Sequence, residues 1–104
     1  MDDSSVTASL AIADLISDKR DEIIALAAQH NVYNVRVFGS AARDELRADS
    51  DIDFLVSGLE NAPWGGGSLL VALEKLLNRR IDLVSEEDLH PLIRPYVLKE
   101  ARPL

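Results

Sequence analysis

The feature that most constrains this chain is a pair of short apolar runs separated by a break and a charged stretch. Residues 35–38 read Val-Arg-Val-Phe, Gly39 and Ser40 follow them directly, and the second run begins at residue 51. Short apolar runs bounded by small residues are typical of buried strands, and glycine with serine interrupts regular structure. The sequence therefore predicts strands at residues 35–38 and 51–56, with a break at Gly39.

The second predicted strand carries carboxylates where most buried strands carry no charge. Asp51 and Asp53 lie at positions i and i+2, so in a strand they point to the same face, roughly 6.5–7 Å apart. Like charges placed in this way repel, and each carboxylate then tends to hold its proton. A divalent cation between them removes that repulsion. We therefore expect a Mg²⁺ site on this face.

A third β-like run contains a further carboxylate. Residues 81–84 read Ile-Asp-Leu-Val, with Asp82 at the second position. If this strand neighbours the strand at residues 51–56, three carboxylates converge on one face of the sheet. Asp51, Asp53 and Asp82 are therefore the candidate metal ligands and catalytic residues.

Helices are predicted between and around these strands, because apolar residues recur at helical spacing in four segments. The segments are residues 6–16, 18–30, 68–77 and 91–100. Ser17 or Asp18 is expected to cap the second helix and Ser68 the third. Asn31 and Asn78 are expected to end these two helices.

The predicted order of elements defines the expected fold. Two helices, a strand, a turn, a strand, a helix, a strand and a final helix give an α+β fold, a small mixed β-sheet with helices packed on one face. The bare face would then carry the carboxylates. Hydrophobic residues make up 47% of the 104 residues, enough for one core, so residues 1–104 are expected to form a single domain. Pro95 should kink or split the last helix.

Composition excludes several classes of function. The formal net charge is −7, and nucleic-acid binding depends heavily on Lys and Arg, so we expect no stable nucleic-acid binding by the chain alone. A basic protein partner fits this charge better. The chain has no cysteine, which excludes disulfides and thiolate metal sites. No apolar run approaches the ~20 residues that span a bilayer, and the N-terminus lacks the basic region of a signal peptide. We expect a cytoplasmic protein.

The spacing of these residues resembles that of a known superfamily. Gly39-Ser40, ten intervening residues and then Asp51-Ile-Asp53, followed by the strand residue Asp82, resemble the DNA polymerase β-type nucleotidyltransferases. The small size and the runs Val-Arg-Val-Phe-Gly-Ser-Ala-Ala-Arg, Ser-Asp-Ile-Asp and Arg-Ile-Asp-Leu-Val resemble its minimal nucleotidyltransferase (MNT) antitoxin family. Members of that family pair with HEPN-domain ribonuclease toxins. The resemblance covers the chain from about residue 17 onwards.

This resemblance implies a minimal nucleotidyltransferase fold and a reaction. The expected activity is transfer of AMP from ATP to a tyrosine hydroxyl of a HEPN-type toxin, which would neutralise the toxin. Two Mg²⁺ ions about 3.5–4 Å apart would hold the attacking and leaving oxygens in line. Asp51 and Asp53 would bridge both ions, and Asp82 would complete the ion nearest the nucleophile.

The resemblance also implies a set of nucleotide-binding residues. The expected residues are Gly39, Ser40, Arg43, Arg47 and Ser50. Gly39 would leave room for a triphosphate near the backbone, and Ser40 would offer its hydroxyl and backbone N–H groups to phosphates. Either arginine could neutralise phosphate charge, and Ser50 could orient Asp51.

Other functions stay open at this point. The domain could be a non-catalytic antitoxin that masks its toxin, or a nucleotidyltransferase that acts on an RNA end. An EF-hand calcium loop is a further alternative, because Asp49, Asp51, Asp53 and Glu60 fall at its positions 1, 3, 5 and 12, but Phe54 stands where that loop needs glycine. The chain has little beyond the metal face, so we expect a hetero-complex in which a partner completes the site.

Overall fold

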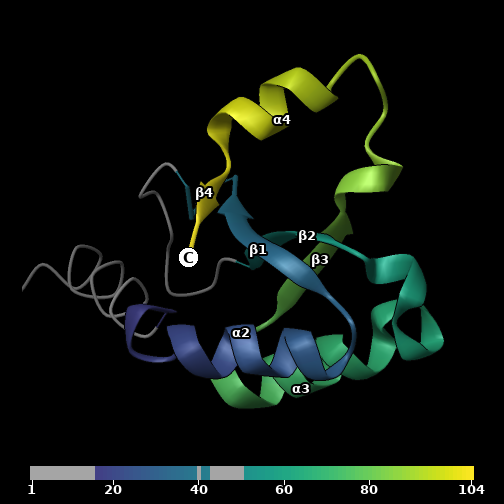
Figure 1. The fold of residues 1–104 in the computed structure, drawn as a ribbon. Helices are drawn as coiled ribbons and strands as arrows, with labels where there is room; N and C mark the ends of the chain where they lie inside the picture. Colours follow the sequence, from purple (N-terminus) through teal and green to yellow (C-terminus); the bar gives the residue numbers. More distant parts are fainter. Residues whose placement is uncertain (1–15, 40, 43–50) are drawn as a thin grey trace, which may run out of the picture.

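The computed structural model describes residues 16–39, 41–42 and 51–104, and these form a four-stranded sheet with helices (Figure 1). The strands, in the order in which they lie in the sheet, are β3 (Ile81–Ser85), β2 (Ile52–Ser57), β1 (Tyr33–Phe38) and β4 (Arg102–Pro103). β1 is antiparallel to both β2 and β4, whereas β2 and β3 are parallel. The predicted mixed sheet of an α+β fold is confirmed.

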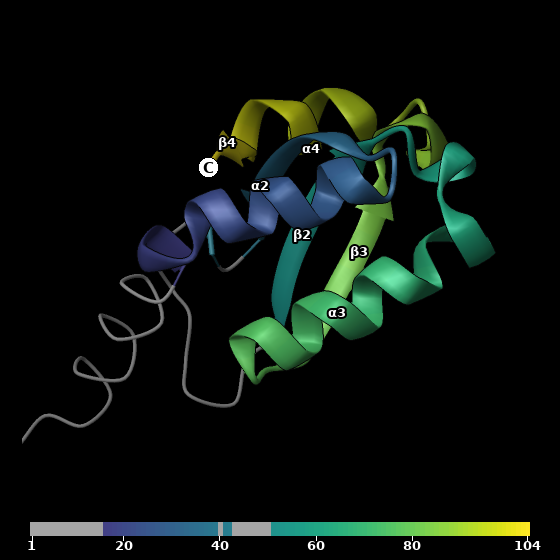
Figure 2. The same cartoon turned by 60° about the horizontal axis from the view of Figure 1, so that its bottom comes forward.

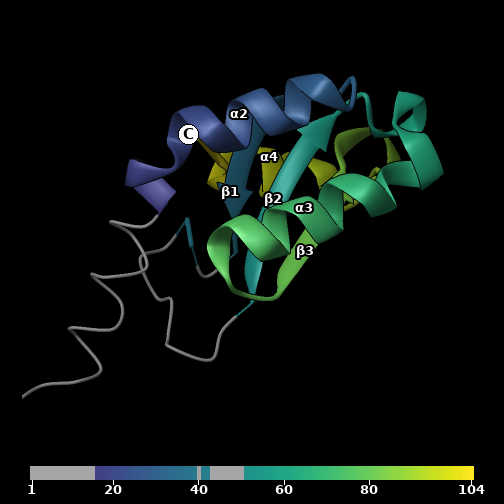
Figure 3. The same ribbon diagram turned by 90° about the horizontal axis from the view of Figure 1, so that it is seen from below.

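Helices lie on both sides of this sheet. α2 (Arg20–Gln29) and α3 (Gly67–Leu77) cover one face, which we call the first face, and α4 (Arg94–Glu100) lies on the side of the second face (Figures 1 and 3). The predicted cover by helices on one face is therefore found in α2 and α3. α4 adds partial cover to the face that we expected to be bare.

The parallel pair β2 and β3 is joined through α3. Two short 3₁₀ helices, η1 (Leu59–Asn61) and η2 (Pro63–Gly66), lead from β2 into α3, and η3 (Glu86–Asp88) follows β3. Parallel neighbours need such a crossover, because a tight hairpin can join only antiparallel strands. Figure 2 shows α3 beside β3, the second of the two strands that it connects.

The core lies between the first face and the two helices that cover it. Its side chains recur every four residues in the helices and every two residues in β2, as expected from the helical period of about 3.6 and the strand period of 2. They are Ile23 and Ala27 of α2, Leu69, Leu73 and Leu77 of α3, and Ile52, Phe54 and Val56 of β2. All are nearly or fully buried, and each of the large ones contributes roughly 1.5–3 kcal/mol of transfer free energy.

The starts of the helices differ from the sequence prediction. α2 begins after Lys19, and no side chain caps it, so the predicted cap at Ser17 or Asp18 is wrong. α3 begins after Gly66, whose φ of 94° is left-handed. Ser68 therefore lies inside the first turn rather than at the cap. In both helices tertiary packing outweighs the preference of short polar residues for the cap, which is only about 1 kcal/mol.

The ends of the helices follow the prediction. Asn31 has φ 64° and Asn78 has φ 53°, the left-handed conformation that asparagine tolerates after a helix. The last predicted helix is split, because residues 91–93 form a turn and α4 begins at Arg94. Pro95 then falls in the first helical turn, where its missing N–H has no helical partner to lose. The helix predicted at residues 6–16 lies outside the described residues, apart from Ile16.

Candidate active site

The second face of the sheet brings together carboxylates from neighbouring strands. Asp53 of β2 pairs with Asp82 of β3 and, on its other side, with Phe38 of β1. Residues paired in this way point to the same face, on strands about 4.8 Å apart. Asp53 is half-buried and Asp82 is exposed. β3 therefore neighbours β2, which is the condition under which we expected Asp82 to share a face with Asp53.

Asp51 lies immediately before β2 and is exposed. The next residue, Ile52, donates its N–H to the Arg80 carbonyl at 3.1 Å, so pairing toward β3 begins directly after Asp51. Its spacing from Asp53 keeps Asp51 at the same end of the sheet. Within residues 16–39, 41–42 and 51–104, no three acidic or histidine side chains gather closely enough to hold a metal ion. The site of three metal ligands therefore stays a prediction.

Gly39 follows β1 and lies against Asp53. Its φ is +65°, a conformation that residues with a side chain rarely adopt. A Cβ at this position would lie 2.5 Å from Asp53 Oδ2, which is far inside van der Waals contact. Glycine is thus required here for two reasons, the backbone conformation and the close approach of the carboxylate. We had predicted Gly39 from its place in the motif, and the structure supplies its contact with Asp53.

Glu100 is a residue of this region that sequence reasoning missed. Gly39 donates its backbone N–H to Glu100 Oε1 at 2.8 Å, although the two residues are 61 positions apart. A glutamate at the end of an amphipathic helix is common, and it gives no sign of such a contact. β4, which follows Glu100, has only two residues, too few to show a strand period.

A partly buried ion-pair cluster fixes the other end of α4. Glu86 bonds Arg36 of β1 through Oε1 and Arg94 of α4 through Oε2, both at 2.6 Å from an Nη2 atom. The Arg36 and Glu86 side chains are only 11% and 17% exposed. Charge-assisted bonds of this length in a partly dry site hold their partners firmly. The cluster therefore ties the start of α4 to the centre of the sheet.

Four of the predicted nucleotide-binding residues lie outside the described part of the chain. They are Ser40, Arg43, Arg47 and Ser50. Their roles stay predictions, as does the position of Asp49 in the alternative calcium loop.

The donor chemistry of the described carboxylates fits magnesium. Asp53 and Asp82 present oxygen ligands from neighbouring strands on one face, and Mg²⁺ is usually bound through one or two carboxylates together with substrate phosphates. Asp51 could add a third carboxylate from the same end of β2. Because position 39 is a glycine, the Asp53 carboxylate can lie directly against the backbone that follows β1.

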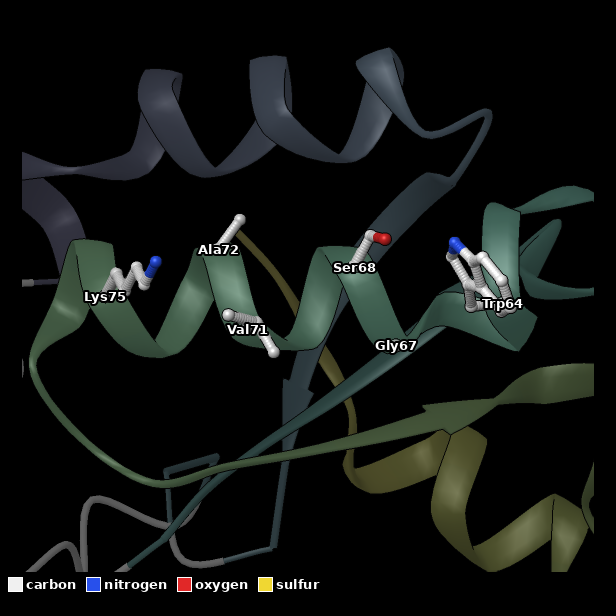
Figure 4. A pocket seen from close by; sticks show the side chains of 6 residues that line it. All are labelled: Trp64, Gly67, Ser68, Val71, Ala72 and Lys75. Carbon is white, nitrogen blue, oxygen red and sulfur yellow. The ribbon is translucent and has the colours of Figure 1, made fainter.

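A hollow along α3 lies apart from these carboxylates (Figure 4). It is lined by Trp64, Gly67, Ser68, Val71, Ala72 and Lys75. Trp64 is 89% exposed, and α3 covers the first face of the sheet. Because Asp53 and Asp82 lie on the second face, this hollow is not part of the candidate site.

None of the helices within the described residues is long and apolar enough to cross a membrane.

Comparisons with known proteins place this geometry in a family. Residues 20–104 match the nucleotidyltransferase domain family. The chain is 35% identical to the Methanocaldococcus jannaschii protein named "Putative protein adenylyltransferase MJ0435" over 93 residues, which are 83% of this chain and 94% of the relative. A second protein of that organism, similarly named and numbered MJ1379, is 35% identical over 74 residues, 68% of this chain and 71% of the relative.

Solved structures agree with this assignment. One described as a "putative minimal nucleotidyltransferase" has a TM-score of 0.80 and 44% identity, and the match covers 88% of this chain and 95% of that one. A toxin–antitoxin structure with AMP-PNP has a TM-score of 0.65 and 22% identity, covering 80% of this chain and 69% of that one, and so shares the fold. The same holds for the toxin–antitoxin MntA-HpeT, with a TM-score of 0.64 and 19% identity over 79% of this chain and 68% of that one. The chain therefore belongs to the nucleotidyltransferase domain family.

Proposed function

We propose that this protein is a metal-dependent adenylyltransferase that moves AMP from ATP to a tyrosine hydroxyl of a HEPN-type ribonuclease toxin. The modification would neutralise the toxin, so the protein would act as its antitoxin. The observation that carries the proposal is the pairing of Asp53 with Asp82 in register, beside Gly39. Support comes from the relatives named as protein adenylyltransferases and from the fold shared with toxin–antitoxin structures.

The reaction is an in-line displacement at the α-phosphorus of ATP. The tyrosine oxygen forms a bond to that phosphorus, the bond to the bridging oxygen of the β-phosphate breaks, and pyrophosphate leaves. Asp82 lies exposed at the edge of the carboxylate pair and would help to take the hydroxyl proton. Asp51 and Asp53 would hold the nucleotide's cation against the end of β2.

Bound Mg²⁺ would neutralise the triphosphate and stabilise the charge that develops on the attacking and leaving oxygens. The ligands would be Asp51, Asp53 and Asp82. This chain contributes little but positioning and electrostatics, which is how most phosphoryl-transfer sites act. The turn after β1, with Gly39 and Ser40, would hold the β- and γ-phosphates.

The test follows the α-phosphate and the γ-phosphate of ATP separately. The protein is incubated with Mg²⁺ and the purified HEPN-type toxin encoded beside it, using ATP labelled at either the α- or the γ-phosphate. We expect the toxin to retain the α-label and never the γ-label, with a matching AMP adduct in intact mass. Replacing the acceptor tyrosine of the toxin by phenylalanine should abolish labelling.

Two results would contradict the proposal. Labelling from the γ-phosphate would indicate a kinase. Complete absence of an adduct, in a reaction where a known adenylyltransferase labels its own target, would exclude AMP transfer to this partner.

A non-catalytic antitoxin that masks its toxin is the second candidate. The observation that favours it is a cluster of exposed apolar side chains around the start of α4. Leu92, Ile93 and Tyr96 are 76%, 50% and 75% exposed, and a protein partner could bury them. The double variant Asp51→Asn with Asp53→Asn decides between the two, because a masking antitoxin would still protect cells from the toxin.

A further inference from the structure

Glu100 joins the C-terminal part of the chain to the candidate site through a charge-assisted hydrogen bond to Gly39. Its Oε1 accepts the N–H of Gly39 at 2.8 Å, in a partly buried position. Hydrogen bonds to an ionised carboxylate are roughly twice as strong as neutral ones. The contact therefore orients the peptide group that precedes the Gly39 turn.

The register of β4 brings Glu100 to this place. Arg36 pairs with Pro103 and Val37 with Arg102, and the Leu104 N–H donates to the Val35 carbonyl at 3.4 Å. Continuing the same antiparallel register by two residues places Gly39 opposite Glu100. The pairing of β4 with β1 therefore brings the end of α4 close to Gly39.

The other end of α4 is held independently. Arg94 bonds Glu86 through both the carboxylate and the backbone carbonyl, at 2.6 Å and 3.0 Å, and Glu86 bonds Arg36 of β1 at 2.6 Å. α4 is therefore fixed at its start by ion pairs and at its end by β4. A helix held at both ends can keep Glu100 in one position.

We propose that Glu100 is a positioning residue for nucleotide transfer, and this inference rests on the proposed function. Gly39 has a left-handed backbone and lies against Asp53 Oδ2, so a rotation of its peptide group would move the turn that is expected to hold the phosphates. The Glu100 carboxylate prevents that rotation. It acts through Gly39 and does not itself touch the nucleotide.

The experiment compares Glu100→Ala with Glu100→Gln in the full chain. A glutamine side chain keeps an oxygen that can accept the Gly39 N–H, whereas alanine has none. Glu60→Ala is the matched control, because it removes an exposed glutamate from η1. Two measurements are made: the ¹H shift and hydrogen exchange of the Gly39 amide by NMR, and KM and kcat for ATP in AMP transfer.

We expect Glu100→Ala to expose the Gly39 amide to exchange and to raise KM for ATP about tenfold, as the loss of one charged hydrogen bond allows. The value of kcat should change less. Glu100→Gln should keep the amide protected and stay within about threefold of the parent in KM. Glu60→Ala should match the parent in both measurements.

Several outcomes would overturn this inference. An unchanged Gly39 amide in Glu100→Ala would show that the contact does not hold the turn, whether or not the protein transfers AMP. Tighter ATP binding in Glu100→Ala would mean that Glu100 blocks the site instead of shaping it. Equal increases of KM in the alanine and glutamine variants, with the Gly39 amide still protected in the glutamine variant, would mean that Glu100 does not act through its bond to Gly39. Absence of transfer by the parent would reject the proposed function, while the amide measurement would still decide the role of Glu100.

Discussion

The two faces of the sheet differ sharply in composition, although the same strands build both. On the first face β2 presents Ile52, Phe54 and Val56 to α2 and α3, and all three are at most 1% exposed. On the second face β2 presents Asp53 and the fully buried Leu55. Because side chains alternate along a strand, β2 presents core residues on one face and a candidate site residue on the other.

The two faces therefore contribute differently to the stability of the fold and to the candidate site. Apolar burial, which dominates folding free energy, is concentrated on the first face. The second face instead holds charged groups whose positions are set by register and ion pairs. Substitutions on neighbouring residues of one strand should therefore separate stability from activity.

The largest effect should come from removing a charge on the second face. We expect Asp53→Asn to lower AMP transfer about 1,000-fold, since electrostatic stabilisation of phosphoryl transfer commonly accounts for that much. The melting temperature should change little, because the amide has nearly the same shape. Transfer is measured with α-labelled ATP, and Asp88→Asn, an exposed position on η3, is the control. Equal activity of the two variants would show that Asp53 is not part of the active site.

The next effect should appear on the first face, one residue further along β2. Phe54 is fully buried, so Phe54→Ala should lower the free energy of unfolding by about 3–4 kcal/mol, through lost burial and a cavity. Urea denaturation measures this change. Val71→Ala on α3, where the side chain is 51% exposed, should change stability by less than about 0.5 kcal/mol. A small effect of Phe54→Ala would mean that the core can collapse around this position.

A pair of glycines tests the close approach at Asp53. Gly39 and Gly65 both have positive φ, +65° and +61°, but a Cβ at Gly39 would meet Asp53 Oδ2 while a Cβ at Gly65 would meet nothing within 4 Å. Each alanine substitution should destabilise the fold by about 1 kcal/mol through the left-handed backbone.

Only Gly39→Ala should also impair transfer, by roughly 50-fold, because misplacing a site group by about 1 Å can lower the rate that much. Unfolding curves and initial rates of the two variants are compared side by side. Similar rates in both would show that the space beside Asp53 is not needed for the reaction.

The smallest effect concerns Glu87 in η3, the 3₁₀ helix that follows β3. A hydrogen bond from the Ser85 hydroxyl, 2.9 Å from Glu87 Oε1, lowers the pKa of Glu87 from its usual 4.5. A carboxyl with a lowered folded pKa stabilises the protein above its unfolded pKa, and this contribution is lost as pH falls through the folded value.

Ser85→Ala should therefore raise the pKa of Glu87 toward 4.5 and weaken the pH dependence of stability in the acid range. An NMR titration of the Glu87 carboxyl carbon gives the shift directly. Glu87→Gln, which has no titratable group at this position, should show the same weakened pH dependence. If the pKa of Glu87 is unchanged in Ser85→Ala, its lowered value must come from other neighbours, such as the Arg94 charge.

Local sequence patterns were sufficient to predict the features that depend on one segment of the chain. The apolar runs predicted β1, β2 and β3, and the two-residue spacing put Asp51 and Asp53 on one side of a strand. Asn31 and Asn78 predicted two helix ends, because left-handed conformations are a property of single residues. The roles of Ser40, Arg43, Arg47 and Ser50 remain predictions from the motif.

Contacts between residues that are distant in sequence could be identified only from the fold. That β3 lies beside β2 with Asp82 level with Asp53 follows from the crossover through α3, and no local pattern encodes it. The two-residue strand β4 has no period to detect, and Glu100 meets Gly39 only because β4 pairs with β1. Helix starts were missed because packing outweighs the small free energies of capping. Periodicity is a property of one segment, whereas register is a property of two paired strands. The candidate site depends on the register of β1, β2 and β3.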